Sequence, residues 1–361
     1  MQNHKDKKKI AIIGTVGVPA NYGGFESLVE NLLGDNTSEN IKYTVFCSSK
    51  SYSEKLDSYK GAKLKYIGLN ANGAQSTLYD IVSMLKTTNK YDVALVLGVS
   101  GCVFLPIFRL WFKNKLIVNI DGLEHRRDKW GKFAKWFLLK SEAMAVKYAD
   151  VVVADNKGIQ DYVTETYHTD SALIAYGGDH AERHVADDVQ QQVLKDYGVE
   201  KDRYAISVCR IEPENNCHVI LDAFSKTNKK LIYIGNWERS EYGRKLKEDY
   251  SKFPNLIIHD PEYNLDTLYA LRSNAAMYIH GHSAGGTNPS LVEAMFFGKP
   301  IIAFDCIYNR ATTHEQAYYF MDSKELQGII EKEKCDGAVM RKIAEEEYTW
   351  KKIANQYENL Y

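Results

Sequence analysis

The segment with the clearest capacity for chemistry is Gly285-Gly286-Thr287-Asn288-Pro289, in which two glycines precede a helix start. Asparagine is a preferred N-cap and proline suits the first helical position, so a helix is predicted to begin here. Backbone N–H groups at such a start bind phosphate, and glycines allow a ligand to approach closely. Glu293 lies one turn further along, within reach of a sugar hydroxyl. We therefore predict a phosphate site, because a helix needed only for packing would not require both glycines.

A second glycine pair, Gly23-Gly24, precedes another predicted helix soon after the first apolar run of the chain. Its loop begins at Gly14 and does not have the G-x-G-x-x-G spacing of a dinucleotide turn. The free N–H groups of this helix start favour a binding role, and an ordinary strand-to-helix connection is the alternative.

Charged residues follow the apolar run 116–120, as Asp121-Gly122-Leu123-Glu124-His125-Arg126-Arg127-Asp128. Such groups suit acid–base work or recognition of sugar hydroxyls, and a solvated loop is the alternative. Arg210 follows another apolar run, where it can hold a diphosphate bidentately or form a structural ion pair. Asp155 and Tyr176 also follow apolar runs, and position alone leaves function and packing open for both.

Lysines and aromatic residues alternate over residues 129–140, which include Lys132, Lys135 and Trp136. This composition suits an anionic membrane surface, although the helical pattern is not cleanly amphipathic. A half-buried helix is the alternative. The longest uncharged stretch, residues 93–108, contains a proline and two glycines and is too short to span a membrane.

The elements that must position these residues alternate between apolar strands and amphipathic helices. Parallel sheets covered on both faces have this pattern, and their ligands bind beyond the carboxyl ends of the strands. The pattern restarts after about residue 178, so two doubly wound α/β domains are predicted. Runs taken as strands are 10–13, 43–46, 93–97, 116–120, 151–154, 172–175, 204–209, 231–234, 256–259, 277–280 and 301–304.

Composition excludes several classes of protein. A hydrophobic content of 45% and a charged content of 26% indicate a globular chain, and a net charge of −1 argues against nucleic acid as a partner. The 6 cysteines are scattered without metal-ligand spacing, which favours a reduced, cytoplasmic protein without a metal centre. The polar N-terminus does not match a secretory signal.

Together these residues resemble the retaining glycosyltransferases of family 4, in particular a bacterial rhamnosyltransferase-like branch. Four ordered motifs carry the resemblance, and it extends over nearly the whole chain: Ile13 to Glu26, Asp121 to Glu124, Arg210 to Asn216, and Gly285 to Met295. The resemblance implies the GT-B fold, two Rossmann-like domains facing a central cleft. Residues 1–178 would form the acceptor domain, with a last helix at about 340–361 packing back on it, and residues 179–339 the donor domain.

The resemblance also implies roles for individual residues. Gly23 and Gly24 would face both substrates, and Asp121, Glu124, Asp155 and Tyr176 would bind or activate the sugars. Arg210 and the amides around Gly286 and Thr287 would hold the diphosphate, Glu293 would reach the deoxyribose, and Tyr263 would lie near the base. Two positions depart from the wider family, which has a glutamate where this chain has Gly285 and a lysine where it has Asn215.

The implied reaction transfers L-rhamnose from dTDP-β-L-rhamnose, without a cofactor or metal, to a saccharide on polyprenyl diphosphate. The product would extend a surface polysaccharide, made at the inner face of the cytoplasmic membrane. A UDP-hexose donor is the first alternative. A non-hydrolysing sugar-nucleotide epimerase and a non-catalytic sugar-nucleotide-binding protein are the others.

Overall fold

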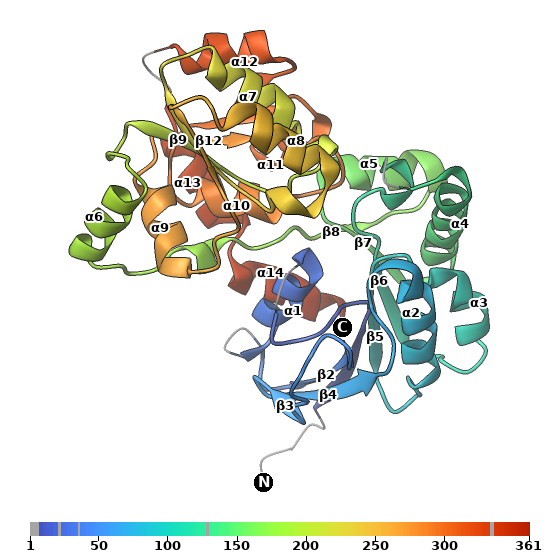
Figure 1. The fold of residues 1–361 in the computed structure, drawn as a ribbon. Coiled ribbons are helices and arrows are strands. Elements are labelled where there is room, and N and C mark those ends of the chain that lie inside the picture. The colour runs from blue at the N-terminus through green and yellow to red at the C-terminus, as the bar shows by residue number, and fades with distance from the viewer. Residues whose placement is uncertain (1–6, 21–22, 35–36, 128–129, 333–335) are drawn as a thin grey trace. The chain divides into compact units, whose positions relative to one another are not determined.

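The computed structural model describes residues 7–20, 23–34, 37–127, 130–332 and 336–361. Some residues of the features discussed above lie outside these ranges: residues 1–6 of the polar N-terminus, Asn21, Tyr22, Asp128, Lys129 and Cys335. The chain forms two compact units (Figure 1). The N-terminal unit combines Met1–Tyr176 with Trp350–Tyr361, and the C-terminal unit is Gly177–Thr349.

The N-terminal unit is built on a sheet with the strand order β3-β4-β2-β1-β5-β6-β7-β8. Its strands are parallel except for β3, which is antiparallel to β4. The strand order reverses between β1 and β5, and such a switch point is where open α/β sheets bind ligands. The strands are β1 (Lys8–Ile13), β2 (Ile41–Ser48), β3 (Ser58–Tyr59), β4 (Ala62–Ile67), β5 (Val93–Leu97), β6 (Lys115–Asn119), β7 (Val151–Ala154) and β8 (Ala172–Leu173).

Helices cover both faces of this sheet, as right-handed crossovers on either side of the switch point require. Helix α1 (Gly24–Leu32) and helix α14 (Trp350–Leu360) share a core cluster with β1, β2 and β5 on one face. The other face carries α2 (Ser76–Leu85), α3 (Leu105–Phe108), α4 (Lys132–Tyr148) and α5 (Lys157–Tyr167) (Figure 1).

The C-terminal unit contains a wholly parallel sheet with the order β11-β10-β9-β12-β13-β14. Its switch point lies between β9 and β12. The strands are β9 (Tyr204–Val208), β10 (Lys230–Ile234), β11 (Leu256–His259), β12 (Met277–His280), β13 (Ile301–Phe304) and β14 (Tyr318–Phe320).

Helices α7 (Cys217–Ser225), α8 (Glu241–Tyr250) and α12 (Ser323–Ile330) pack on one face of the second sheet around a shared core cluster. The remaining helices of the unit are α6 (Asp187–Asp196), α9 (Leu265–Ser273), α10 (Pro289–Met295), α11 (Ile307–Thr312) and α13 (Ala338–Glu347). The doubly wound α/β prediction is confirmed for both units.

The structure differs from the sequence prediction in three strands and one helix. β3, β4 and β14 were not predicted: β3 has only 2 residues, β4 alternates lysine with apolar residues, and β14 has only 3 residues. The single helix expected at about 340–361 is divided into two: α13 ends at Glu347, and α14 begins at Trp350. Only α14 belongs to the N-terminal unit.

Candidate active site

The loop after β1 is wrapped around a buried carboxylate, that of Glu26 on α1. Its Oε1 accepts hydrogen bonds from Thr15 Oγ1 at 2.9 Å and from the Val16 amide at 2.7 Å. Burial raises the pKa of Glu26, while these hydrogen bonds lower it in part. A Cβ on Gly23 would lie 1.9 Å from Glu26 Oε2, and Gly23 has a φ of 135°. Gly23 is thus required by the fold of the loop itself.

Gly24 follows this loop as the first residue of α1. A Cβ there would lie 3.5 Å from the hydroxyl of Tyr176, an ordinary contact distance. Tyr176 is 4% exposed, and burial raises its pKa, as do the nearby carboxylates of Asp121 and Asp155. The structure therefore brings Gly24, Asp121, Asp155 and Tyr176 together at the carboxyl edge of the sheet.

Asp121 follows β6 and has a φ of 59°, in the left-handed region that residues other than glycine rarely adopt. Its backbone N–H donates to Asn119 Oδ1 at 2.9 Å. Asp155 follows β7 and is 1% exposed. These two carboxyl groups come from neighbouring strands, so the alternation of strands and helices is what places them side by side.

Glu124 has a different environment from Asp121, although the two residues share one motif. Its carboxylate accepts from Arg127 Nη1 at 2.6 Å and from Trp130 Nε1 at 2.9 Å. Both oxygens thereby hold the segment that leads into α4, and a sugar hydroxyl would have to compete with these donors.

In the C-terminal unit, the loops that follow β9 and β12 are joined across the switch point. Asn216 Nδ2 donates to the Gly281 carbonyl at 2.9 Å, and the Ser283 amide donates to the Glu214 carbonyl at 2.9 Å. A Cβ on Gly281 would lie 2.0 Å from the Asn215 carbonyl oxygen, so glycine is needed for this approach. The two loops form one surface at the position where a nucleotide is expected to bind.

Asn215 connects these loops through both ends of its buried side chain. Its Nδ2 donates to the Arg210 carbonyl at 2.7 Å, and its Oδ1 lies 2.7 Å from His282 Nδ1. The predicted direct contact of Asn215 with the donor would require these bonds to break. Arg210 itself is 39% exposed, with its Nε 4.0 Å from Glu212 Oε2, and this distance leaves the guanidinium only loosely held.

Two histidines at the end of β12 received no role from the sequence. His280 is 2% exposed, and burial together with His282 lowers its pKa to about 3, so its ring is neutral. His280 Nε2 has no hydrogen-bond partner among the residues that the structure describes. Their position beyond an apolar run was the available signal, because the carboxyl end of a strand at the switch point carries ligand-binding residues.

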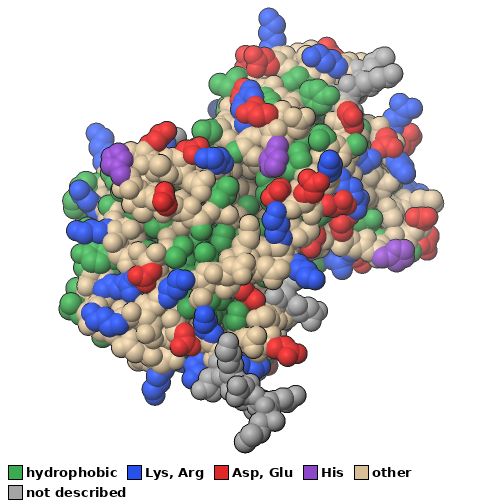
Figure 2. All heavy atoms as spheres, turned by 180° about the vertical axis from the view of Figure 1, so that it is seen from behind, with side chains coloured by type: hydrophobic (Ala, Val, Ile, Leu, Met, Phe, Trp, Pro, Cys, Tyr) green, Lys and Arg blue, Asp and Glu red, His purple; other side chains and the backbone are tan. Residues whose placement is uncertain are grey.

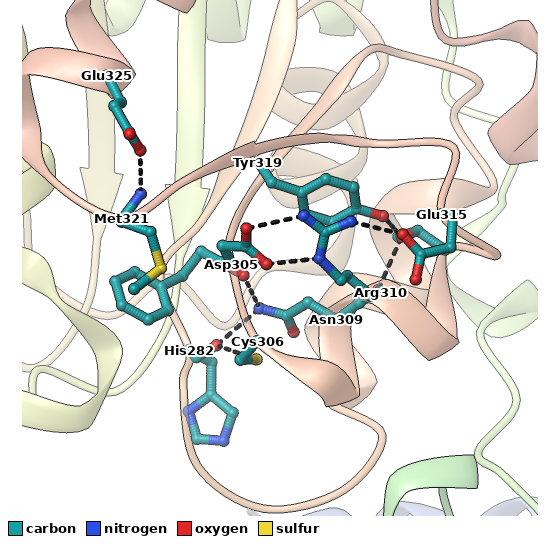
Figure 3. Close-up of polar contacts among 11 residues, drawn as sticks. His282, Asp305, Cys306, Asn309, Arg310, Glu315, Tyr319, Met321 and Glu325 are labelled. Atoms are coloured by element: carbon teal, nitrogen blue, oxygen red, sulfur yellow. Dashed lines mark hydrogen bonds and ion pairs between the residues drawn. The ribbon is translucent and has the colours of Figure 1, made fainter.

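The loop after β12 is also fixed from the side of β13, as Figure 3 shows. Asn309 Nδ2 donates to the carbonyl oxygens of His282 and Phe304, each at 2.8 Å. Arg310 forms a bidentate ion pair with Asp305, at 2.6 and 2.8 Å, and its guanidinium lies 4.2 Å from the ring centre of Tyr319. Through α11, these contacts connect the loop after β12 to the end of β13 and to β14.

The predicted helix start at Asn288 is confirmed. Asn288 Oδ1 accepts from the Ser290 amide at 3.0 Å, and Pro289 is the first residue of α10. Gly285 has a φ of 86°, and Thr287 is 5% exposed. Tyr263, by contrast, is 71% exposed between β11 and α9.

Glu293 on α10 is held at both carboxylate oxygens. Arg272 Nη2 lies 2.8 Å from Oε2, and His180 Nε2 lies 3.3 Å from Oε1. Burial alone would raise the pKa of Glu293, but the charges of Arg272 and His180 lower it to about 2. Glu293 is therefore a fixed, ionised carboxylate. Its Arg272 partner lies 21 positions away in the sequence, with no motif to indicate the pairing.

No group of three or more His, Cys, Asp or Glu residues within the described ranges has a geometry that would hold a metal ion. Over those same ranges, no helix has both the length and the apolar composition needed to cross a membrane.

Comparisons with known proteins follow the division into units. Residues 7–179 match the family described as "Domain of unknown function (DUF1972)", and residues 189–346 match "Glycosyl transferases group 1". The C-terminal unit thus contains a group 1 glycosyltransferase domain, and group 1 glycosyltransferases use nucleotide-sugar donors. A search of curated proteins finds no match.

Solved structures resemble the chain over its full length. Sucrose-phosphate synthase from Thermosynechococcus elongatus has a TM-score of 0.80 at 16% identity, with 98% of each chain covered. Anabaena HepE in complex with UDP-glucose has a TM-score of 0.74 at 14% identity, again with 98% of each chain covered. The catalytic domain of Arabidopsis thaliana starch synthase IV, bound to ADP and acarbose, has a TM-score of 0.70 at 10% identity, also with 98% of each chain covered. At these identities the likeness shows the fold, which is GT-B.

Proposed function

We propose that this chain, a GT-B glycosyltransferase with a group 1 domain in its C-terminal unit, transfers L-rhamnose from dTDP-β-L-rhamnose with retention of configuration. The acceptor is a saccharide on polyprenyl diphosphate, and the product extends a surface polysaccharide. The observation that carries the proposal is the joined pair of loops at the β9–β12 switch point: the loop that contains Arg210 is bonded to the loop that leads into α10, which supports a common diphosphate site. The four sequence motifs support the choice of sugar.

In the proposed mechanism, the bond between the sugar C1 and the diphosphate oxygen breaks while the acceptor oxygen bonds to C1 from the same face, and the proton of the acceptor hydroxyl passes to the departing diphosphate oxygen. Negative charge develops on the departing diphosphate. Arg210 and the backbone N–H groups from Gly286 to Asn288 stabilise that charge, since donors placed where charge develops are a major source of catalysis. Asn215 acts through the Arg210 carbonyl and His282, which fix the shape of the loop.

Glu293 binds the hydroxyl of the deoxyribose in this proposal, and His180 is the partner that yields to it. The His180 bond is the longer of the two, and His180 is 34% exposed, whereas Arg272 is 8% exposed. In the N-terminal unit, Asp121, Asp155, Tyr176 and Gly24 line the sugar side. Asp121 and Asp155 orient the sugar and acceptor hydroxyls through their carboxylates.

Arg210→Ala tests the diphosphate assignment. Loss of one such donor lowers turnover by about 10²–10³-fold. Arg203→Ala is the matched control, because Arg203 is exposed and precedes β9 whereas Arg210 follows it. Turnover of Arg210→Ala close to that of the control would remove Arg210 from the site.

UDP-hexose is the alternative donor, favoured by the full-length likeness to a protein bound to UDP-glucose. Direct comparison of dTDP-rhamnose with UDP-glucose and other sugar nucleotides as donors separates the two. Release of nucleotide or epimerised sugar without any acceptor would instead indicate an epimerase.

We also propose that the N-terminal unit binds the inner face of the cytoplasmic membrane, where a lipid-linked acceptor resides. On α4, Phe133 is 77% and Trp136 54% exposed. Ile107 on the adjoining α3 is 51% exposed, and Leu110, just after α3, is 72% exposed. Figure 2 shows hydrophobic side chains interspersed with Lys and Arg along this edge of the unit. Apolar anchors among lysines are the composition that anionic lipid surfaces bind.

Sedimentation with vesicles tests this surface. The protein should bind vesicles that contain anionic lipid, lose binding as salt is raised, and bind less when Lys132→Glu and Lys135→Glu are combined. Lys229→Glu with Lys245→Glu, two exposed lysines of the C-terminal unit, is the control of equal charge change. Equal binding by both double variants would exclude α4 as the membrane contact.

A further inference from the structure

Asn119, the last residue of β6, makes two hydrogen bonds inside the core of the N-terminal unit. It is 1% exposed. Its Oδ1 accepts from the Asp121 backbone N–H at 2.9 Å, and its Nδ2 donates to the Tyr357 hydroxyl at 2.7 Å. The amide orientation is determined by chemistry, because a backbone N–H can only donate, so the oxygen must face Asp121 and the NH₂ must face Tyr357.

Tyr357 is held in place by the helix that carries it. Trp350, Ile353, Ala354 and Tyr357 form the buried face of α14, and Tyr357 is 0% exposed. A phenylalanine ring would fill the same space, so packing alone does not call for a hydroxyl. Burial raises the pKa of Tyr357 and the Asn119 hydrogen bond lowers it in part, while the carboxylates of Asp155 and Asp121 raise it further. The phenol thus lies near both carboxylates of the proposed sugar site.

We propose that Tyr357 is a positioning residue for the reaction: through Asn119, it fixes the backbone of Asp121 in the left-handed conformation that directs the Asp121 carboxylate to the sugar. That conformation, with φ at 59°, is disfavoured for aspartate and persists only where neighbouring groups determine it. The Asn119 bond to the Asp121 amide is one such constraint, and it is only as rigid as the Asn119 side chain. The Tyr357 hydroxyl holds the other end of that side chain.

This inference rests on the proposed function, because it assigns Asp121 a role in sugar transfer. It adds Tyr357 from helix α14, 238 positions from Asn119 in the sequence, which none of the four motifs includes. It also means that the packing of α14 against the N-terminal sheet affects turnover.

Tyr357→Phe tests the proposal, with Tyr43→Phe as the control. Tyr43 is also buried, and its hydroxyl bonds to that of Tyr361, the residue after α14, at 3.2 Å, so each variant removes one hydroxyl that joins residues 350–361 to the sheet. We expect Tyr357→Phe to lower kcat by about 10–100-fold, as small misplacements of catalytic groups do, with an unchanged KM for the donor. Tyr43→Phe should retain the kcat of the unmodified protein.

A double-variant cycle separates positioning from a general loss of structure. If Tyr357 acts through Asp121, then Tyr357→Phe should have little further effect on kcat in an Asp121→Asn background. The proposal would be overturned if the fold reductions in kcat caused by Tyr357→Phe and Asp121→Asn multiplied in the double variant. Equal kcat values for Tyr357→Phe and Tyr43→Phe would also overturn it.

Hydrogen exchange provides a readout that does not depend on activity. The Asp121 amide should exchange faster in Tyr357→Phe than in Tyr43→Phe, because its acceptor is released. Unchanged exchange at Asp121 would overturn the relay even in an active enzyme. A protein that transfers no sugar from any donor, yet shows the faster exchange, would instead refute the proposed function and leave the relay standing.

Discussion

Replacement of Arg272 by methionine is expected to lower the stability of the protein by an amount that depends on pH. Arg272 is the buried partner of Glu293, at 2.8 Å, and methionine keeps an apolar stem while removing the charge. The pKa of Glu293 falls from an ordinary 4.5 to about 2. At 1.36 kcal/mol for each pKa unit, this fall corresponds to about 3 kcal/mol of folding free energy.

The direction of the pH effect follows from the sign of the shift. A carboxyl group whose pKa is lowered by folding contributes stability above its unfolded pKa, and that contribution is lost as the pH falls from about 4.5 toward 2. Without Arg272, only His180 opposes the effect of burial, so the pKa of Glu293 should rise and the variant should lose less stability on acidification than the unmodified protein. The difference in stability between the two proteins should therefore be largest near pH 7 and shrink as the pH falls toward 2.

Urea denaturation at a series of pH values measures this difference. Glu293→Gln in the Arg272→Met background should recover part of the loss, since the unpaired buried charge is removed. Arg341→Met is the control: Arg341 has two ion pairs but is 48% exposed, and such pairs contribute at most about 1 kcal/mol. A stability difference for Arg272→Met that is the same at pH 7 and pH 3 would refute the reasoning.

Two further predictions concern residues that hold loops in shape. Gly23→Ala would place a Cβ 1.9 Å from Glu26 Oε2 at a φ of 135°, and should cost about 1–3 kcal/mol or more, whereas Gly131→Ala, with open space around it, should cost little in thermal unfolding. Asn215→Ala should raise the donor KM because it releases both Arg210 and His282, at about 1–3 kcal/mol for the buried groups left unpaired. Asn264→Ala, which removes two cap bonds of α9, should lower stability without a change in the donor KM.

The sequence predicted most of the fold because each buried strand is a continuous apolar run. Strands β5, β7, β11, β12 and β13 have the predicted bounds to the residue. β4 was missed because lysines alternate with its apolar residues, and its partners could not be known before the sheet order. The division of the last helix between α13 and α14 was also missed, since both halves are amphipathic and no glycine or proline separates them.

Positions of site residues along the strands were predictable, whereas their partners were not. Asp121, Asp155 and Tyr176 follow strands, and the rule for parallel sheets places them at one edge. Side-chain pairing depends on distances in three dimensions, which is why the Asn215–His282 and Arg272–Glu293 contacts carried no sequence signal. Glu26 was part of a motif, but its role as the centre of the β1 loop becomes visible only when Thr15 and Val16 are seen to donate to it.

The most direct test of the account is a donor panel with a synthetic saccharide on polyprenyl diphosphate as acceptor. Product is detected by mass, and its anomeric configuration is determined by NMR. We predict transfer from dTDP-β-L-rhamnose in preference to UDP-hexoses, with a β-linked rhamnose that retains the configuration of the donor. Transfer from a UDP-hexose alone, or an α-linked product, would contradict it.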